Sequence, residues 1–168
     1  CEIDRVLDEH GGPQSVATIG RMELLPGAAN VVPGEARFSL EFRDISATQL
    51  DELADAFRLA LSSIARRRSL MFEFRVISDI EPVACDKNIQ KIITQEATRL
   101  DLPCHALPSG AAHDTQQLAR ITDAGMIFVP SKVGRSHSAA EWTSWDDIKA
   151  GANVLLNSLY KLASRTDV

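Results

Sequence analysis

Residues 36–68 read ARFSLEFRDISATQLDELADAFRLALSSIARRR and decide the fold class. In the first part apolar and polar side chains alternate, with Phe38, Leu40 and Phe42 on one face, which predicts a half-buried β-strand. Ser46 and Gln49 then have the spacing of a capping box. The apolar residues that follow predict one face of a helix of about five turns: Leu50, Leu53, Ala54, Phe57, Leu61 and Ile64. A strand that leads directly into a long helix indicates a mixed α and β fold.

The rest of the chain alternates between strand and helix patterns in the same way. Upstream, it predicts a helix around residues 3–7 that ends at His10-Gly11-Gly12-Pro13, and a strand over residues 15–25. Downstream, it predicts strands over 70–76 and 126–129, and helices over 86–100, 115–120 and 144–162. We therefore expect an α/β chain in two parts. The first, residues 1–81, is an antiparallel α+β part, and the second, residues 82–168, is part of a doubly wound domain.

Composition excludes several classes of protein. The 168-residue chain has a formal net charge of −5, which suits a phosphate backbone poorly, so we expect no nucleic-acid partner. No stretch approaches the roughly 20 apolar residues of a membrane span, so we expect no membrane partner either. Three widely spaced cysteines, Cys1, Cys85 and Cys104, favour a reducing, cytoplasmic setting over a disulfide framework.

Three residues stand where chemistry could occur. His113 and His137 fall in loops after strand-like segments, where α/β sheets gather ligands. His113 precedes Asp114 at a predicted helix N-terminus, which could supply amide donors to an anion. Arg43 lies at a strand end off the predicted core face, where a guanidinium can pair with a carboxylate. Two histidines do not make a catalytic zinc centre, which needs three protein ligands. On spacing alone, ordinary loop and surface positions remain the simpler interpretation.

Six segments, in their order along the chain, match the motifs of a known protein family. They are PGAANVVPG (26–34), LEFRD (40–44), SGAAHD (109–114), MIFVPS (126–131), SHSAAE (136–141) and TSWDD (143–147). Together they resemble the hydantoinase/carbamoylase branch of the M20 family of dinuclear-metal amidohydrolases. This branch includes N-carbamoyl-L-amino-acid hydrolases, allantoate amidohydrolase and β-alanine synthase. The resemblance spans essentially the whole chain.

The resemblance implies a role for each part. Residues 1–81 would be the later part of a lid or dimerisation domain, and residues 82–168 the C-terminal part of a zinc-peptidase-like, metal-binding catalytic domain. By motif, Asn30 and Arg43 match the family residues that bind the substrate carboxylate, often in the active site of the partner subunit. His113 matches the histidine that contacts the scissile carbonyl or ureido group, and His137 matches the last metal ligand.

The resemblance also implies an activity. The enzyme would use two divalent metal ions (zinc, manganese or cobalt) and a glutamate base to hydrolyse linear amide or ureido C–N bonds in small carboxylate-bearing substrates. It would act as a homodimer through the lid domain.

Two positions depart from the family pattern. Ala112 occupies a substrate-binding position where glycine is preferred, and Arg135 replaces a small or apolar residue just before the Ser-His pair.

We expect the chain to be a C-terminal fragment of such an enzyme. The first helix begins without a cap, and the family's other metal ligands, its base and its lid histidine would all precede residue 1. Alone, the chain would then bind no metal tightly and would be inactive. Two alternatives stay open. One is a noncatalytic binding or dimerisation module, and the other is an M20 aminoacylase or peptidase.

Overall fold

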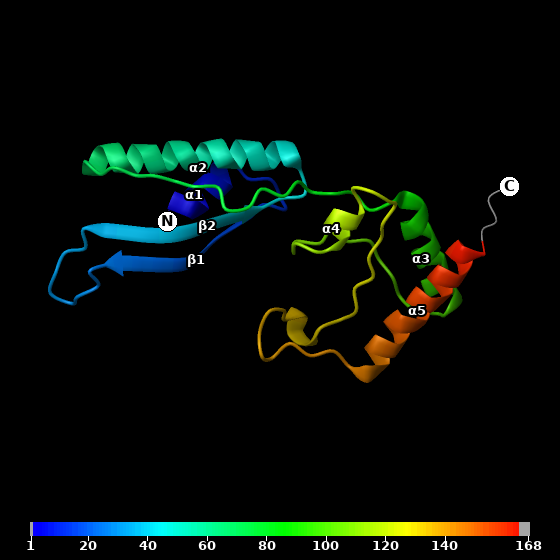
Figure 1. Cartoon of the computed structure of the whole chain (residues 1–168). Helices are drawn as coiled ribbons and strands as arrows, with labels where there is room; N and C mark the ends of the chain where they lie inside the picture. The colour runs from blue at the N-terminus through cyan, green and yellow to red at the C-terminus, as the bar shows by residue number, and fades with distance from the viewer. Residues whose placement is uncertain (1, 165–168) are drawn as a thin grey trace. The chain divides into compact units, whose positions relative to one another are not determined.

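The structure is a computed structural model that describes residues 2–164 (Figure 1). The chain divides into two compact units, Cys1–Pro82 and Val83–Val168, which we describe separately. Unit 1 contains α1 (Glu2–His10), β1 (Val16–Leu25), β2 (Glu35–Arg43) and α2 (Ala47–Arg68). Unit 2 contains α3 (Lys87–Arg99), α4 (Thr115–Leu118), the short 3-10 helix η1 (Lys132–Gly134) and α5 (Trp145–Ala163). The predicted mixture of helices and strands is confirmed.

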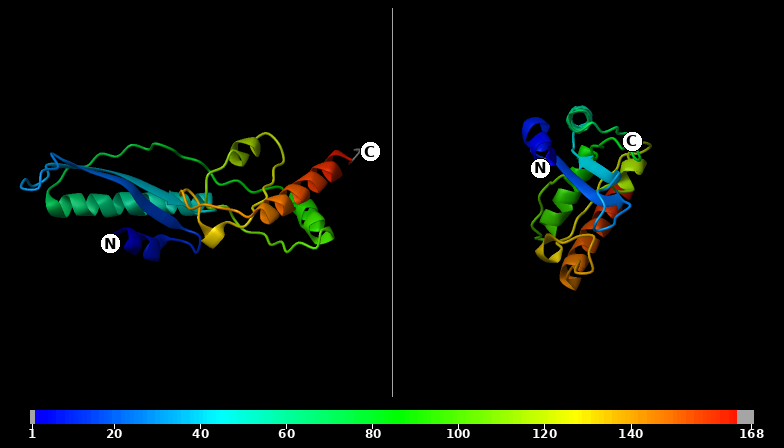
Figure 2. Two further views of the ribbon diagram at one scale, coloured as in Figure 1. Left: turned by 90° about the horizontal axis from the view of Figure 1, so that it is seen from below. Right: turned by 90° about the vertical axis from the view of Figure 1, so that its left-hand side faces the viewer.

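Unit 1 is built on an antiparallel hairpin. β1 and β2 pair from Val16 opposite Arg43 to Leu25 opposite Glu35, with an irregularity between Thr18 and Arg21. The two strands are joined by residues 26–34, and the Gly34 N–H donates to the Leu25 carbonyl at 2.9 Å. Both α1 and α2 lie on the same face of the hairpin (Figure 2). The predicted strands at 15–25 and 36–43 are therefore confirmed within one residue at each end.

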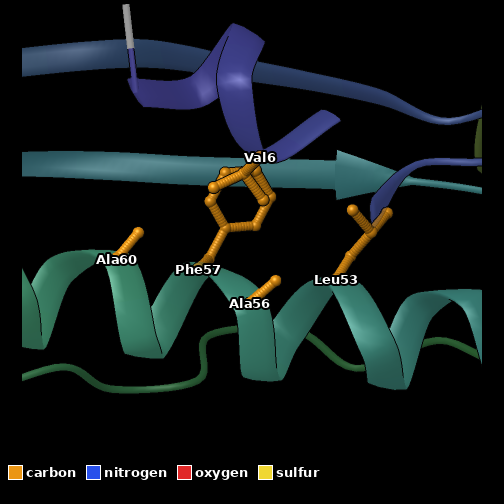
Figure 3. Packing of buried hydrophobic residues seen from close by; sticks show 5 residues of the cluster. All are labelled: Val6, Leu53, Ala56, Phe57 and Ala60. Carbon is orange, nitrogen blue, oxygen red and sulfur yellow. The ribbon is translucent and has the colours of Figure 1, made fainter. Parts of the chain in front are cut away.

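The core of unit 1 lies between the two helices and the hairpin. Val6 of α1 meets Phe57 and Leu53 of α2 (Figure 3), and these side chains are 2%, 5% and 0% exposed. The Phe42 ring lies 5.4 Å from the Phe57 ring, so the strand face packs against the same cluster. Phe38, predicted to face inward, is 42% exposed. The nine-residue α1 spans only about 14 Å, whereas β2 spans about 26 Å, so α1 does not cover the whole strand.

The predicted capping box is half formed. The Ser46 hydroxyl accepts the Gln49 N–H at 3.3 Å, as predicted. The return bond is not made, because the Gln49 side-chain amide donates to the His10 carbonyl at 2.6 Å. The Ser46 N–H donates instead to Asp44 at 2.8 Å. These contacts tie the end of α1 and the end of β2 to the start of α2.

The strand predicted at residues 70–76 is wrong. This segment runs back alongside α2 without strand hydrogen bonds (Figure 1). It is held by Phe74, whose ring lies 5.0 Å from the Arg58 guanidinium. A strand is stable only when another strand satisfies its N–H and C=O groups, and in the described part of unit 1 only β1 and β2 pair. The alternating pattern is present, but its partner strand is not.

Unit 2 is a pair of packed helices with long connecting loops. The Asp86 carboxylate caps α3 by accepting the Asn88 and Ile89 N–H groups at 2.9 and 2.8 Å. The Ser144 hydroxyl caps α5 by accepting the Asp147 N–H at 3.1 Å. Both helix starts were predicted from the sequence. None of the described helices is both long and apolar enough to cross a membrane.

The strand predicted at residues 126–129 is also wrong, for the same reason as the first. Residues 126–129 have no paired strand within residues 83–164. Part of the apolar face of α5 stays uncovered, and Leu155, Leu156 and Leu159 are each more than half exposed. The segment does touch α5, since a Cβ on Gly151 would lie 2.4 Å from the Val129 Cγ1.

Glu96 joins the two helices of unit 2. Its side chain is 7% exposed, and it accepts a hydrogen bond from Arg99 Nε at 2.7 Å and faces Lys161 Nζ of α5 at 3.4 Å. The hydrogen bond from Arg99 lowers the pKa of Glu96 below its ordinary value of 4.5, and Lys161 adds to the effect. The charged carboxylate therefore holds α5 against α3.

The contacts of Glu96 with Arg99 and Lys161 predict that unit 2 becomes less stable at acidic pH. Because the pKa of Glu96 is lowered by folding, its contribution is present above pH 4.5 and is lost as the pH falls through the folded-state pKa. We expect the α3 and α5 signals to melt at lower temperature as the pH drops through this range. In Glu96→Gln this part of the pH dependence should be missing. Thermal unfolding followed by the amide nuclear magnetic resonance signals of α3 and α5 at several pH values measures it, and an unchanged profile in the variant contradicts the assignment.

Candidate active site

Arg43 is the last residue of β2 and points away from the core of unit 1. Its guanidinium donates from Nε to Glu41 Oε1 at 2.7 Å, and Nη2 lies 2.6 Å from the same oxygen. Its side chain is 45% exposed. The adjacent Asp44 is fixed, because it accepts hydrogen bonds from the Ser15 hydroxyl at 2.6 Å and from the Ser46 N–H at 2.8 Å. Arg43 is thus an accessible cation on a rigid strand end.

The ion pair of Glu41 with Arg43 was not predicted from the sequence. Residues two apart on a strand share a face, so the spacing of Glu41 and Arg43 could have revealed the pair. A substrate carboxylate that binds Arg43 has to compete with Glu41 or share the guanidinium with it.

Asn30 lies at the other end of the hairpin. It sits in the exposed loop of residues 26–34, next to a turn in which the Val31 N–H donates to the Ala28 carbonyl at 3.3 Å. This loop lies beyond the Glu35 end of β2, whereas Arg43 is at the opposite end (Figure 1). The strand between Glu35 and Arg43 alone is about 26 Å long, at roughly 3.3 Å per residue. One copy of the chain therefore does not bring both side chains to one small carboxylate.

His113 has a ring whose hydrogen-bonding state is fixed by its neighbours. The Thr115 N–H donates to Nδ1 at 3.1 Å, and the Thr115 hydroxyl lies 2.8 Å from the same atom. A nitrogen that accepts a backbone N–H carries no proton, so the neutral ring has its proton on Nε2. His113 thus presents an N–H donor from an exposed loop. Ala112, just before it, is also exposed.

The prediction of free amide donors beside His113 is wrong. The helix after it, α4, has only four residues, and Asp114 makes no side-chain cap. The Thr115 N–H is taken by the His113 ring, and the Gln116 N–H donates to the His113 carbonyl at 2.9 Å. The Thr115 and Gln116 amides are therefore already engaged.

His137 lies in the loop between η1 and α5 with an unusual backbone. Its φ is +56°, a left-handed value that non-glycine residues rarely adopt. Its N–H donates to Glu141 Oε2 at 2.8 Å, and Nδ1 lies 3.0 Å from the Ser136 hydroxyl. The Ser136 hydroxyl can donate to Nδ1 or accept from it, and in the tautomer with the proton on Nδ1 the Nε2 atom has a free lone pair. A hollow of about 200 Å³ in the same loop is lined by Lys132, Val133, Arg135 and Ala140.

The described residues do not form a metal site of their own. Among residues 2–164, no group of three or more histidine, cysteine, aspartate or glutamate side chains is placed to hold an ion. Zinc in proteins needs three or four such ligands.

Comparison with known proteins decides the family. Residues 2–161 match the sequence profile of peptidase family M20/M25/M40. The chain belongs to this family. M20 peptidases generally use divalent metal ions. The resemblance inferred from the six segments is thereby confirmed.

Relatives within the M20 family narrow the comparison. The chain is 37% identical to the N-carbamoyl-L-amino acid amidohydrolase of Geobacillus stearothermophilus, over 89% of this chain and 36% of the relative. It is 32% identical to the allantoate amidohydrolase of Bacillus subtilis, over 87% of this chain and 35% of the relative. A solved hydantoinase/carbamoylase family amidase from Burkholderia multivorans has a TM-score of 0.89 at 32% identity, covering 99% of this chain and 40% of that one. The chain thus spans little more than a third of the length of these relatives.

Proposed function

We propose that this chain is the C-terminal part of a metal-dependent amidohydrolase that cleaves linear amide or ureido C–N bonds. N-carbamoyl amino acids and allantoate are the substrates that the relatives suggest. The observation that carries the proposal is the identity of 32–37% to amidohydrolases of the M20 family over more than four fifths of this chain. The two unbridged thiols, Cys85 and Cys104, suit a cytoplasmic enzyme.

Each unit has a proposed place in that enzyme. Residues 1–81 form the later part of the lid or dimerisation domain, and residues 82–168 the C-terminal part of the catalytic domain. His137 supplies one ligand to a site with two divalent ions (zinc, manganese or cobalt) that residues outside this chain complete. The missing ligand set within residues 2–164 is why we expect the chain alone to bind no metal tightly.

His113 is the proposed hydrogen-bond donor to the reacting carbonyl. Its Nε2–H is held in the donor state by Thr115, and no rearrangement of the ring is needed when negative charge develops on the carbonyl oxygen. Ala112 places its backbone beside the same substrate group. The methyl group there limits how closely a ligand can approach, compared with glycine.

Asn30 and Arg43 are the proposed partners of the substrate carboxylate. Because they lie at opposite ends of β2, both can reach one substrate only when they come from different copies of the chain. This geometry favours a homodimer through the lid domain, in which each active site combines Arg43 of one copy with Asn30 of the other.

The direct test is hydrolysis by the enzyme that contains this chain, compared with the 168-residue chain alone. We expect ammonia release from an N-carbamoyl-L-amino acid or from allantoate with the longer enzyme, and loss of that activity after treatment with a chelator. The chain alone should release none. Hydrolysis of N-acyl amino acids or dipeptides, with none of ureido acids, would favour an aminoacylase or peptidase. If none of these substrates is hydrolysed, the result would favour a noncatalytic binding or dimerisation module.

A further inference from the structure

The loop that carries His137 is closed on itself by hydrogen bonds. The Lys132 N–H donates to the Trp142 carbonyl at 2.8 Å and joins the two ends. In the first half, the Gly134 N–H donates to the Ser131 carbonyl at 2.9 Å, and the Ser131 hydroxyl donates to the Arg135 carbonyl at 2.5 Å. This half is a tight turn that ends just before Ser136.

The second half of the loop is a separate turn. The Glu141 N–H donates to the Ser138 carbonyl at 3.0 Å. Ser136 and His137 lie between the two turns, and His137 has the left-handed φ of +56°. Steric repulsion of the Cβ opposes this conformation, and a hydrogen bond to the His137 backbone can offset that cost.

One side chain supplies that contact. The Glu141 carboxylate reaches back from the second turn and accepts the His137 N–H at 2.8 Å. A carboxylate acceptor makes a stronger hydrogen bond with an N–H than a neutral one does. Once the backbone is fixed, the Ser136 hydroxyl 3.0 Å from Nδ1 sets the direction of the ring.

We propose that Glu141 is a positioning residue that holds His137 in the left-handed conformation, and that Ser136 then aims the imidazole so that Nε2 faces outward. The use of Nε2 as a ligand rests on the proposed function. The hold on the backbone does not, because it depends only on the carboxylate oxygen and the His137 N–H.

The test is nuclear magnetic resonance of the 168-residue chain and three variants. Glu141→Gln keeps an acceptor oxygen without the charge, and Glu141→Leu removes the acceptor. Asp123→Asn is the matched control, because Asp123 is an exposed acid of the same unit. We expect amide exchange of His137 to accelerate about tenfold or more in Glu141→Leu, and to remain slow in Glu141→Gln and in the control. The imidazole ¹⁵N shifts of His137 should change only in Glu141→Leu.

A measurement on the unmodified chain covers the case in which Glu141→Leu fails to fold. A scalar coupling through the hydrogen bond, between the His137 amide nitrogen and the Glu141 carboxyl carbon, should be observable. Its absence overturns the proposal, as does unchanged His137 exchange in Glu141→Leu while α3 and α5 stay folded. If Glu141→Gln and Asp123→Asn speed exchange as much as Glu141→Leu does, net charge is responsible and the proposal fails. None of these readouts uses hydrolysis, so the proposed activity and this role of Glu141 can fail independently.

Discussion

Two inactive variants of the enzyme that carries this chain, Asn30→Ala and Arg43→Ala, are expected to recover activity when their subunits are mixed. Each variant alone loses one partner of the substrate carboxylate in every active site. Loss of a charge-assisted hydrogen bond of this kind lowers kcat/KM by about 100-fold. The recovery follows from the hairpin, in which the loop of residues 26–34 and Arg43 lie at opposite ends of β2 (Figure 1).

The expected size of the recovery follows from dimer statistics. After equal mixing, about half of the dimers contain one copy of each variant. In such a dimer one site receives both intact residues and the other receives neither. About a quarter of all sites are then intact. Steady-state hydrolysis after dissociation and reassembly of the subunits measures this fraction.

A double variant gives a second readout once native mass spectrometry has confirmed that mixed dimers form, because without subunit exchange the mixture would also keep about half of the activity. When Asn30→Ala/Arg43→Ala is mixed equally with the unmodified enzyme, shared sites leave about a quarter of the activity, whereas unshared sites leave about half. If the single-variant mixture stays inactive while the double-variant mixture retains half, both residues serve their own copy. The assignment of Asn30 and Arg43 to different subunits would then be wrong.

The sequence predicted the helices well because helix signals are local. Ser46, Asp86 and Ser144 each cap the helix that follows them by accepting a nearby N–H, a contact that needs only a few residues of chain. The hairpin was also predictable, since β1 and β2 are neighbours in sequence and satisfy each other. Both successes depend on partners within a short stretch of chain.

The two failed strands, residues 70–76 and 126–129, depend on distant partners. Alternation or a run of apolar residues indicates that a segment is able to form a β-strand. The strand exists only where another strand pairs with its N–H and C=O groups. Phe74 and Phe128 therefore remain more than half exposed. Sequence pattern alone contains no information on whether such a partner is present.

The contacts in the candidate site were likewise not predictable from the sequence pattern. The types of residue at Arg43, His113 and His137 suggested chemistry, yet their states depend on contacts that only the structure revealed. Thr115 fixes the proton of the His113 ring, and Glu141 and Ser136 orient His137.

His113→Ala in the longer enzyme is expected to lower kcat by about 100- to 1,000-fold with little change in KM. This is the usual cost of removing one preorganised donor to a developing oxyanion. The donor acts on charge that appears in the transition state, so the ground-state complex loses little. Thr115→Val should have a smaller effect, since it removes the hydroxyl contact at 2.8 Å but keeps the N–H that holds Nδ1.

The matched control is His105→Ala, because His105 is an exposed histidine of the same unit. It should leave both kinetic constants unchanged on an N-carbamoyl-L-amino acid or allantoate. Equal losses in His105→Ala and His113→Ala would indicate a general effect of removing an imidazole from the surface. A His113→Ala enzyme with normal kcat and a raised KM would place His113 in substrate binding alone. The proposed donor role requires the loss to appear in kcat, since only an interaction that strengthens as the oxyanion forms accelerates the chemical step.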